Sequence, residues 1–524
     1  MTKIKNQFPF YLGITVTLLY LAVNLMVINH YGVTWDYTYH FNAGLWHLHL
    51  PQTDPGFVMG PSPPLSDTFP VVSYEIFSRL FHLLPWDSAY NLYSVILGSL
   101  GIGLLYFMVK KLLNWQTAFF SVISLALLPR YFGHLHNNMK DIPQAVFFTL
   151  AIFSFWLFYK KTNWKTLFFS TFTVALSFNS KVNAIFIPII AFSFLFCVFV
   201  RDRYYGKFSL KPKIKMVILY FILSPVFSFI IWAPFWTHPV TRLIEASHSY
   251  TTSTMNMPIL YFSDIVFSGQ NVPWHYPFGI IAVTTPTVML IFFLIGLLAI
   301  LSWNKILFEE KIFILLWFAI PVSRYFKPHM IVIDDIRHFM EVIFPFAAIT
   351  GLGVYSFFYF VTNKLKNKIA IKNKMSIFIC LSLIYSAYLS YQIITYHPYE
   401  TSYFGELIGG IQKASHKFDI EFWASAYKHA LGYINKNAPK NARIIIPMAP
   451  DIAKLYLRDD LISKLNTANM ADAPSYLYSQ SDYTVVLNRE SFFSWYGIYP
   501  YIQTHKPIYT LSVQDVPLVS IYKN

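Results

Sequence analysis

The feature that most constrains this chain is a series of apolar runs, each close to the length that crosses a lipid bilayer. A transmembrane helix needs about 20 consecutive apolar residues, because the hydrocarbon core of a bilayer is about 30 Å thick. Such runs cover residues 8–29, 88–109, 115–133, 142–159, 164–180, 183–200, 215–236, 278–302, 311–326, 339–361 and 375–395. The sequence therefore predicts an α-helical polytopic membrane protein with about eleven transmembrane helices.

The composition agrees with a membrane protein. Hydrophobic residues make up 55% of the 524 residues and charged residues 12%, about half of the ~25% charged residues usual in soluble proteins. The run 8–29 follows two lysines, as a secretory signal core does, but it is longer than such a core and lacks a small-residue cleavage site, so we interpret it as an uncleaved span. Cys197 and Cys380 both fall inside expected spans, which argues against a disulfide framework or a thiolate metal site.

The net charge of +15 is spread over alternate loops, so it does not indicate a nucleic-acid partner. The amino end and loops 110–111, 160–165, 201–215, 305–311 and 364–374 together contain 20 Lys and Arg residues. The intervening and mostly longer loops 30–87, 130–141, 179–183, 237–277 and 324–338 contain only 8. By the positive-inside rule the amino terminus is expected in the cytoplasm, and an odd number of spans places the carboxyl terminus outside.

The two ends of the chain differ in organisation. We expect residues 1–395 to form a transmembrane domain whose functional outer loops are 30–87, 130–141, 237–277 and 324–338. After residue 395 the apolar runs stop, and residues 396–524 are predicted to form a small extracytoplasmic α/β domain. Its expected elements are an amphipathic helix at 420–436 and buried strands at 443–447, 483–487 and 518–522.

Asp36 is the first candidate for chemistry, because it lies where the first span leaves the bilayer. A partly desolvated carboxylate at this boundary can accept a proton from an incoming hydroxyl group. The alternative is an interfacial aspartate that only marks the membrane edge among aromatic residues.

Polar residues are dense between the third and fourth runs, in the stretch 129–143. Polar groups at membrane depth cost free energy unless they have partners, so a simple connector would not need them. Asp141, Asn138 and His134 could hold a divalent metal or fix a substrate hydroxyl, whereas Arg130 and Lys140 could bind phosphate. The pair His134 and His136 is weak evidence for a metal, because it lacks a settled third ligand.

Further cations are expected on the same side of the membrane. The turn 179–183 is so short that the ammonium group of Lys181 should remain near the outer surface, and Arg337 and His338 open a late span. Arg binds phosphate through two hydrogen bonds and Lys binds it as a point charge, so these residues could bind a phosphate or diphosphate. Alternatively, Arg337 pairs with Asp334 or Asp335 and only anchors its loop.

Three outer aromatic residues, Tyr39, Trp274 and Tyr276, could stack on a sugar ring. Tyr and Trp are also enriched at every membrane interface, and this second interpretation is the favoured one.

Taken together, four motifs resemble bacterial GT-C glycosyltransferases, and within them the group of protein O-mannosyltransferases and aminoarabinose transferases. The motifs are the Asp36 segment, the stretch 129–143, the pair Arg337-His338, and the sequence from His397-Pro398-Tyr399 through Tyr403-Phe404 to Gly409-Gly410. One position departs from the family pattern, because Tyr37 stands where many members have Glu directly after the first-loop Asp.

The resemblance implies a polyprenyl-phosphate sugar donor in the membrane, an acceptor that arrives from outside, and inversion at the anomeric carbon. It assigns Asp36 as the base that deprotonates the acceptor and Asp141 as the second acidic position that shapes the site. Lys181 and Arg337 would then receive the departing lipid phosphate. The expected location is the bacterial cytoplasmic (inner) membrane, and the acceptor could be a protein, a lipid or a glycan.

Two other classes compete with a glycosyltransferase. A multi-span transporter or flippase for lipid-linked sugars would also have many spans and buried charges, but transporters tend to have internal repeats and polar groups at mid-membrane. A non-catalytic assembly protein would not need Asp, Lys, Arg and His concentrated in separate loops on one face. The sequence therefore favours the glycosyltransferase.

Overall fold

The computed structural model describes residues 2–206, 213–232, 236–252, 254–364, 371–464, 478 and 480–524. Parts of the expected loops 201–215, 237–277 and 364–374, the end of the expected span 215–236, and part of the expected domain 396–524 lie outside these residues.

All eleven expected apolar runs are helical over most of their described length. The helices are α1 (Thr2–Val27), α4 (Trp86–Leu112), α5 (Trp115–Ala126), α6 (Pro129–Leu135), α7 (Asp141–Lys160), α8 (Trp164–Phe178), α9 (Phe186–Tyr204), α10 (Ile214–Ile231), α12 (Tyr276–Val283), α13 (Thr287–Ser302), α14 (Phe308–Ser323), α15 (Ile343–Lys364) and α16 (Ile371–Tyr396). Among the described residues, seven helical stretches are long and apolar enough to cross a membrane, or eight if a bent pair counts as one span. The chain is thus an integral membrane protein, and the number of eleven spans stays a prediction.

Two expected spans are each divided into two helices. The run 115–133 forms α5 and α6, which meet at a bend of 66°, and Pro129 occupies the first turn of α6, where it costs no hydrogen bond. The run 278–302 forms α12 and α13, with Pro286 directly before α13. The bend at α6 matters for the site, because it directs the polar stretch 129–143 into the protein.

Close helix packing holds the bundle together. Helix α15 packs against both α13 and α5. At the contact between α13 and α15, a Cβ atom on Gly296 would collide with the carbonyl group of Ile349, and one on Gly353 with that of Phe292. Glycines on both helices therefore let the two backbones approach closely, as small residues commonly do in membranes.

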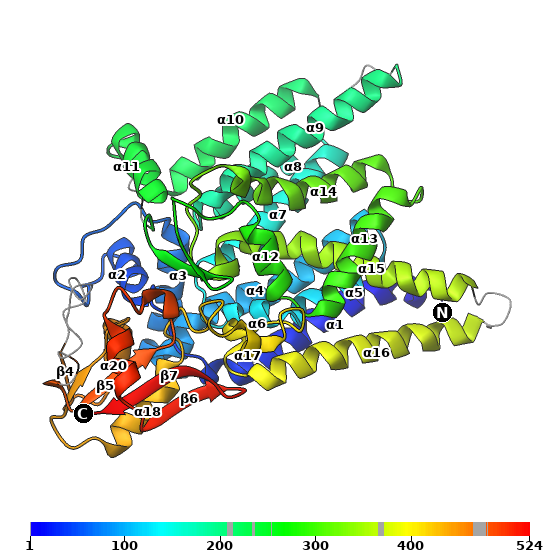
Figure 1. Ribbon diagram of the computed structural model, residues 1–524. Coiled ribbons are helices and arrows are strands. Elements are labelled where there is room, and N and C mark those ends of the chain that lie inside the picture. The colour runs from blue at the N-terminus through cyan, green and yellow to red at the C-terminus, as the bar shows by residue number, and fades with distance from the viewer. Residues whose placement is uncertain are drawn as a thin grey trace.

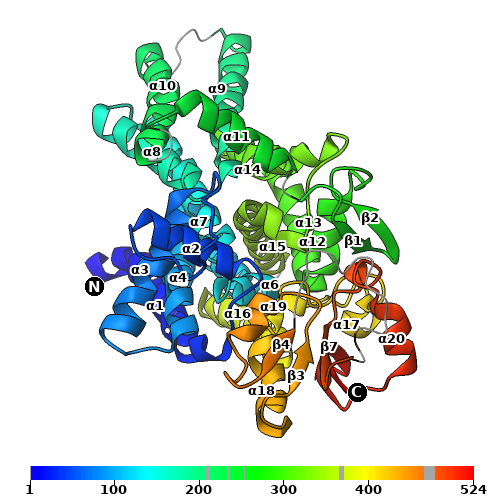
Figure 2. The same cartoon turned by 90° about the vertical axis from the view of Figure 1, so that its left-hand side faces the viewer.

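The segments expected outside the membrane lie at one end of the bundle. In the segment 30–87, α2 (Tyr37–His47) and α3 (Pro64–Tyr74) pack against each other. The segment 237–277 contains α11 (Pro239–Thr252) and a hairpin of β1 (Pro258–Tyr261) and β2 (Asp264–Phe267). Figure 1 shows the sheet and the carboxyl terminus at the end of the bundle opposite the amino terminus. Figure 2 shows α8, α9 and α10 at one side of the bundle, beyond α7.

The carboxyl-terminal sheet has five strands in the order β4–β3–β5–β7–β6. They are β3 (Arg443–Ile445), β4 (Ile462–Lys464), β5 (Tyr483–Leu487), β6 (Tyr509–Val513) and β7 (Val516–Lys523), accompanied by α17 (Gly410–Ala414), α18 (Tyr427–Asn437), α19 (Pro450–Lys454) and α20 (Ile498–Thr504). Strand β3 is parallel to β4 and β5, whereas β7 is antiparallel to β5 and β6. The three expected strands are confirmed, and the expected helix 420–436 begins later, at Tyr427. The segment before this helix instead contacts the chain between the first span and α2, since the carbonyl group of Trp423 accepts a hydrogen bond of 2.9 Å from the backbone N–H of Trp35.

Candidate active site

Asp36 and Arg337 form an ion pair of 2.5 Å between Oδ2 and Nη1, although 301 residues separate them in the sequence. Asp36 directly precedes α2, and its side chain does not cap that helix. Arg337 lies in the short 3₁₀ helix η6 (Asp335–Val342), which leads into α15. The side chain of Asp36 remains 33% exposed, whereas that of Arg337 is 11% exposed. The carboxylate is therefore accessible while its cation is largely enclosed.

The charges around Asp36 keep it ionised. Burial alone would raise the pKa of its carboxyl group, but Arg337, His40 and Lys140 together outweigh burial, so the pKa lies below the usual value. Lys140 belongs to the stretch 129–143, so the first and second outer segments contribute to one electrostatic environment. The expectation that Arg337 pairs with Asp334 is also met, with 2.8 Å between Nη2 and Oδ2, whereas Asp335 pairs elsewhere.

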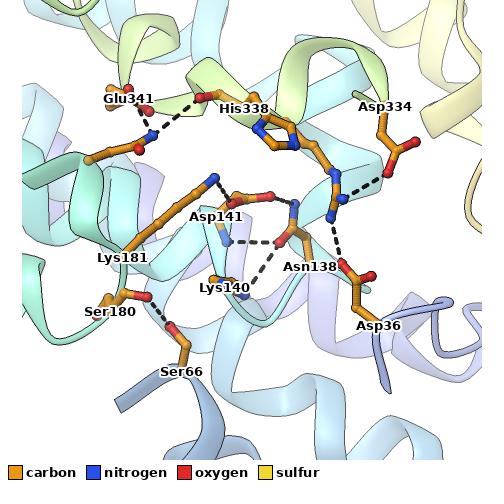
Figure 3. Close-up of polar contacts among 12 residues, drawn as sticks. Asp36, Ser66, Asn138, Lys140, Asp141, Ser180, Lys181, Asp334, His338 and Glu341 are labelled. Atoms are coloured by element: carbon orange, nitrogen blue, oxygen red, sulfur yellow. Dashed lines mark hydrogen bonds and ion pairs between the residues drawn. The ribbon is translucent and has the colours of Figure 1, made fainter. Parts of the chain in front are cut away.

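A second charged cluster surrounds Asp141, the first residue of α7. Lys181 Nζ lies 2.6 Å from Asp141 Oδ1, and the Asn138 side-chain amide donates a hydrogen bond of 3.0 Å to Asp141 Oδ2. The Asn138 side-chain oxygen in turn accepts a 2.8 Å hydrogen bond from the Asp141 backbone N–H. Figure 3 shows Lys181, Asp141 and Asn138 on one side and Asp36 and Asp334 beside them. The structure thus brings together the expected residues Asp36, Asn138, Asp141, Lys181 and Arg337.

Lys181 differs from the expectation that its ammonium group stays near the outer surface. Its side chain is only 11% exposed, and burial lowers its pKa against the attraction of Asp141 and Glu341. The turn that carries it is held by α3, because Ser66 Oγ donates a 3.0 Å hydrogen bond to the Ser180 carbonyl group. The tight turn therefore directs the lysine inward, toward a buried carboxylate, where its charge has a partner.

Arg130 was expected at the donor phosphate, but the structure places it in the interior. It is 0% exposed, pairs with Asp335 at 2.8 Å, and donates hydrogen bonds to the carbonyl groups of Thr401 and Tyr403. Its guanidinium group lies 5.0 Å from the ring centre of Phe404. These contacts occupy the side chain and fix η6 to the segment after α16.

The two histidines of the second segment do not converge on one point. The Asn138 side-chain nitrogen lies 3.3 Å from His134 Nδ1, whereas His136 Nδ1 donates to the Phe132 carbonyl group at 2.8 Å and its ring stacks on Tyr31. In the described part of the chain, no three His, Cys, Asp or Glu side chains are grouped so that they could hold a metal ion. The acidic residues nearest the site are instead paired with Lys and Arg.

One family model and several solved structures are similar to this chain. Residues 69–232 match the family model described as dolichyl-phosphate-mannose-protein mannosyltransferase. The apo oligosaccharyltransferase of Archaeoglobus fulgidus has a TM-score of 0.58 at 11% identity, over 99% of this chain and 76% of that protein. ArnT from Cupriavidus metallidurans bound to undecaprenyl phosphate has a TM-score of 0.50 at 10% identity, over 98% of both chains. The same archaeal enzyme, AglB, in complex with an inhibitory peptide and a dolichol-phosphate has a TM-score of 0.54 at 12% identity, over 99% of this chain and 74% of that one.

The chain has the fold that these membrane transferases share, the GT-C fold. A search of curated proteins finds no significant match. At these low identities the solved structures establish the fold alone. The family match contains Asp141 and Lys181 but ends before Arg337 and begins after Asp36, so only the tertiary structure relates those two residues to the matched segment.

The remaining expected residues lie in different environments. The Tyr39 side chain is 38% exposed and Trp274 is 60% exposed, whereas Tyr276, at the start of α12, is only 1% exposed. Stacking of Tyr276 on a sugar ring is therefore incompatible with this structure. His338 contributes its backbone carbonyl group, which accepts a 3.2 Å hydrogen bond from the Asn183 side chain.

Sequence reasoning missed two groups of residues around the site. His40 lies one helical turn after Asp36, and its Nδ1 is 2.6 Å from Asp67 Oδ1, which fixes the start of α2 to α3. Arg489, which follows β5, lies 2.7 Å from Asp334 Oδ1. The only sequence signal for Arg489 was a charged residue just after a buried strand, a place where functional side chains of sheet proteins often lie.

Proposed function

We propose that this GT-C protein transfers a sugar from a polyprenyl-phosphate donor to a hydroxyl-bearing acceptor outside the membrane, with inversion at the anomeric carbon. The observation that supports this most is the contact between Asp36 and Arg337, because a carboxylate suited to act as a base lies beside a cation suited to bind phosphate. ArnT and AglB, which share the fold, were solved with undecaprenyl phosphate and dolichol-phosphate.

The proposed reaction divides the work between the two charges. Asp36 accepts the acceptor's hydroxyl proton while the acceptor oxygen forms a bond to the anomeric carbon, and the bond from that carbon to the phosphate oxygen breaks. The polyprenyl phosphate leaves with the bonding electrons, and Arg337 and Lys140 stabilise its growing negative charge. Asp141 holds the buried Lys181 in place, and the ammonium group of Lys181 adds positive charge for the departing phosphate.

The contact between Asp36 and Arg337 also supports an order of binding. A donor phosphate competes with Asp36 for Arg337, because both are anions that suit the same guanidinium group. When Arg337 turns to the phosphate, Asp36 loses the charge that lowers its pKa and becomes a stronger base. We therefore propose that the donor binds before the acceptor and thereby activates Asp36.

The topology completes the proposal. The chain lies in a bacterial inner membrane with its amino terminus in the cytoplasm, and the site and the carboxyl-terminal sheet face outward. This orientation is supported by the 20 cationic residues in one set of loops against 8 in the other.

The test uses purified protein in lipid nanodiscs with a panel of labelled polyprenyl-phosphate sugars. Candidate acceptors are a protein, a lipid and a glycan, each offered separately. Sugar transfer by the wild-type protein, with Asp36→Asn inactive, supports the proposal. Absence of transfer from every lipid-phosphate donor, or full activity of Asp36→Asn, would contradict it.

A further inference from the structure

The network around Asp36 continues beyond Arg337 into the carboxyl-terminal region. Arg337 contacts Asp36 through Nη1 and Asp334 through Nη2, at 2.5 and 2.8 Å. The other oxygen of Asp334 lies 2.7 Å from Arg489 Nη2. Arg489 precedes the 3₁₀ helix η10 (Glu490–Phe492) and follows β5 of the five-stranded sheet. Four alternating charges thus connect this sheet to the carboxylate proposed as the base.

Arg489 is itself held firmly. Its side chain is 5% exposed, and its Nη1 donates a 2.8 Å hydrogen bond to the carbonyl group of Phe422. The guanidinium group lies 3.9 Å from the ring centre of Phe492 and 5.4 Å from that of Trp35, the residue before Asp36. A planar guanidinium group fixed by aromatic faces and a carbonyl oxygen has little freedom to leave Asp334.

Asp334 needs both of its cations. Its side chain is only 3% exposed, and its backbone adopts a left-handed conformation with φ of 54°, which is uncommon for a residue other than glycine. Asp335 follows with φ of 65° and pairs with Arg130. Ion pairs on both aspartates therefore maintain the strained entry into the helix that carries Arg337.

The charge balance indicates what Arg489 does. A buried aspartate with a single partner would attract Arg337 with its whole charge. Because Arg489 neutralises part of the charge of Asp334, the guanidinium group of Arg337 can also attract Asp36 and an incoming phosphate. We propose that Arg489 is a positioning residue that acts through Asp334 to keep Arg337 at the transfer site, so that the carboxyl-terminal sheet region is part of the catalytic machinery. This inference rests on the proposed function of Asp36 and Arg337.

A double-mutant cycle tests this coupling in kcat/KM for the donor. Arg489→Gln should lower kcat/KM at least about tenfold and Arg337→Gln about 100-fold, and the double variant should resemble Arg337→Gln alone, because the first change acts through the second residue. Arg489→Lys should restore part of the loss. A matched cycle combines Arg489→Gln with Lys181→Met. Because Lys181 lies outside the chain of four charges, the two losses in kcat/KM should multiply.

The control is Arg443→Gln in the same sheet, where an exposed arginine lies 3.6 Å from Asp482. It should leave kcat/KM unchanged. All values refer to monodisperse protein, and if Arg489→Gln is not monodisperse, Arg489→Lys takes its place in both cycles. The proposal would be overturned if the losses of Arg489→Gln and Arg337→Gln multiply in the double variant. It would also be overturned if the losses fail to multiply in both cycles alike, or if Arg489→Gln keeps full activity.

A structural readout separates this inference from the proposed function. If the wild-type protein transfers no sugar, the proposed function fails, and cryo-electron microscopy of Arg489→Gln then decides the positioning role. Arg337 should leave Asp36 and turn fully to Asp334. An unchanged Asp36–Arg337 contact in the variant would refute the role of Arg489.

Discussion

Asp36 and Arg337 contact each other at 2.5 Å across 301 residues of sequence. The pair connects the start of α2, after the first span, to η6, which leads into α15. It can therefore form only after the helix bundle has assembled. Its opposite charges are those that an inverting transfer from a lipid phosphate uses, a base for the acceptor and a cation for the leaving group.

Asp36→Asn should lower kcat by about 10²–10⁴-fold, because the amide cannot accept the acceptor's proton. Donor binding should remain intact, since Arg337 is then free of its competing carboxylate. The measurement is a steady-state transfer assay together with equilibrium binding of the labelled donor. Asp54→Asn, in an exposed position of the same outer segment, serves as the control and should retain full activity.

Arg337→Gln should move the pH dependence of kcat/KM. In the wild type the pKa of Asp36 is lowered, so the ion pair persists at neutral pH and is lost only as the pH falls through that lowered pKa. Without Arg337, burial raises the pKa of Asp36, while His40 and Lys140 oppose this only in part. The acid limb of the residual activity should therefore appear at a higher pH. An acid limb that stays in place would show that Asp36 is not the titrating base.

Lys181→Met should destabilise the protein by about 3–5 kcal/mol, because it leaves Asp141 buried without its cation. Combining it with Asp141→Asn should recover most of this stability in thermal unfolding experiments. Transfer activity should stay low in the double variant if the pair serves the site. Recovery of both stability and activity would limit Lys181 and Asp141 to a structural role.

Arg130→Met should reduce folded protein rather than donor affinity. The side chain is 0% exposed and its removal leaves Asp335 unpaired, at a cost of about 3–5 kcal/mol. The measurement is the monodisperse yield together with the donor Kd of the folded fraction. A folded variant with a much weaker donor Kd would instead return Arg130 to the phosphate site.

Much of the fold could be predicted from local sequence. The helices α1, α4 and α7 and the strands β5 and β7 were expected because apolar length and strand-forming residues are properties of short segments. The bend between α5 and α6 was not expected, since its apolar run is nearly continuous and the change of direction depends on packing. The helix expected at 420–436 begins later than predicted for a similar reason, because residues before it bind other segments. The carbonyl group of Phe422 accepts a hydrogen bond from Arg489, and that of Trp423 accepts one from Trp35.

Of the candidate site, the sequence determined which charged residues are present and that polar groups at membrane depth need partners. Only the tertiary structure decided the partners: Asp36 and Asp334 for Arg337, Asp335 for Arg130, and Asp141 for Lys181. Arg130 and Arg337 have the same side chain and were expected to act alike, yet one is fully enclosed and the other borders an accessible carboxylate. Side-chain chemistry is local, but the dielectric surroundings and the distance to the next charge depend on segments that lie hundreds of residues apart in the sequence.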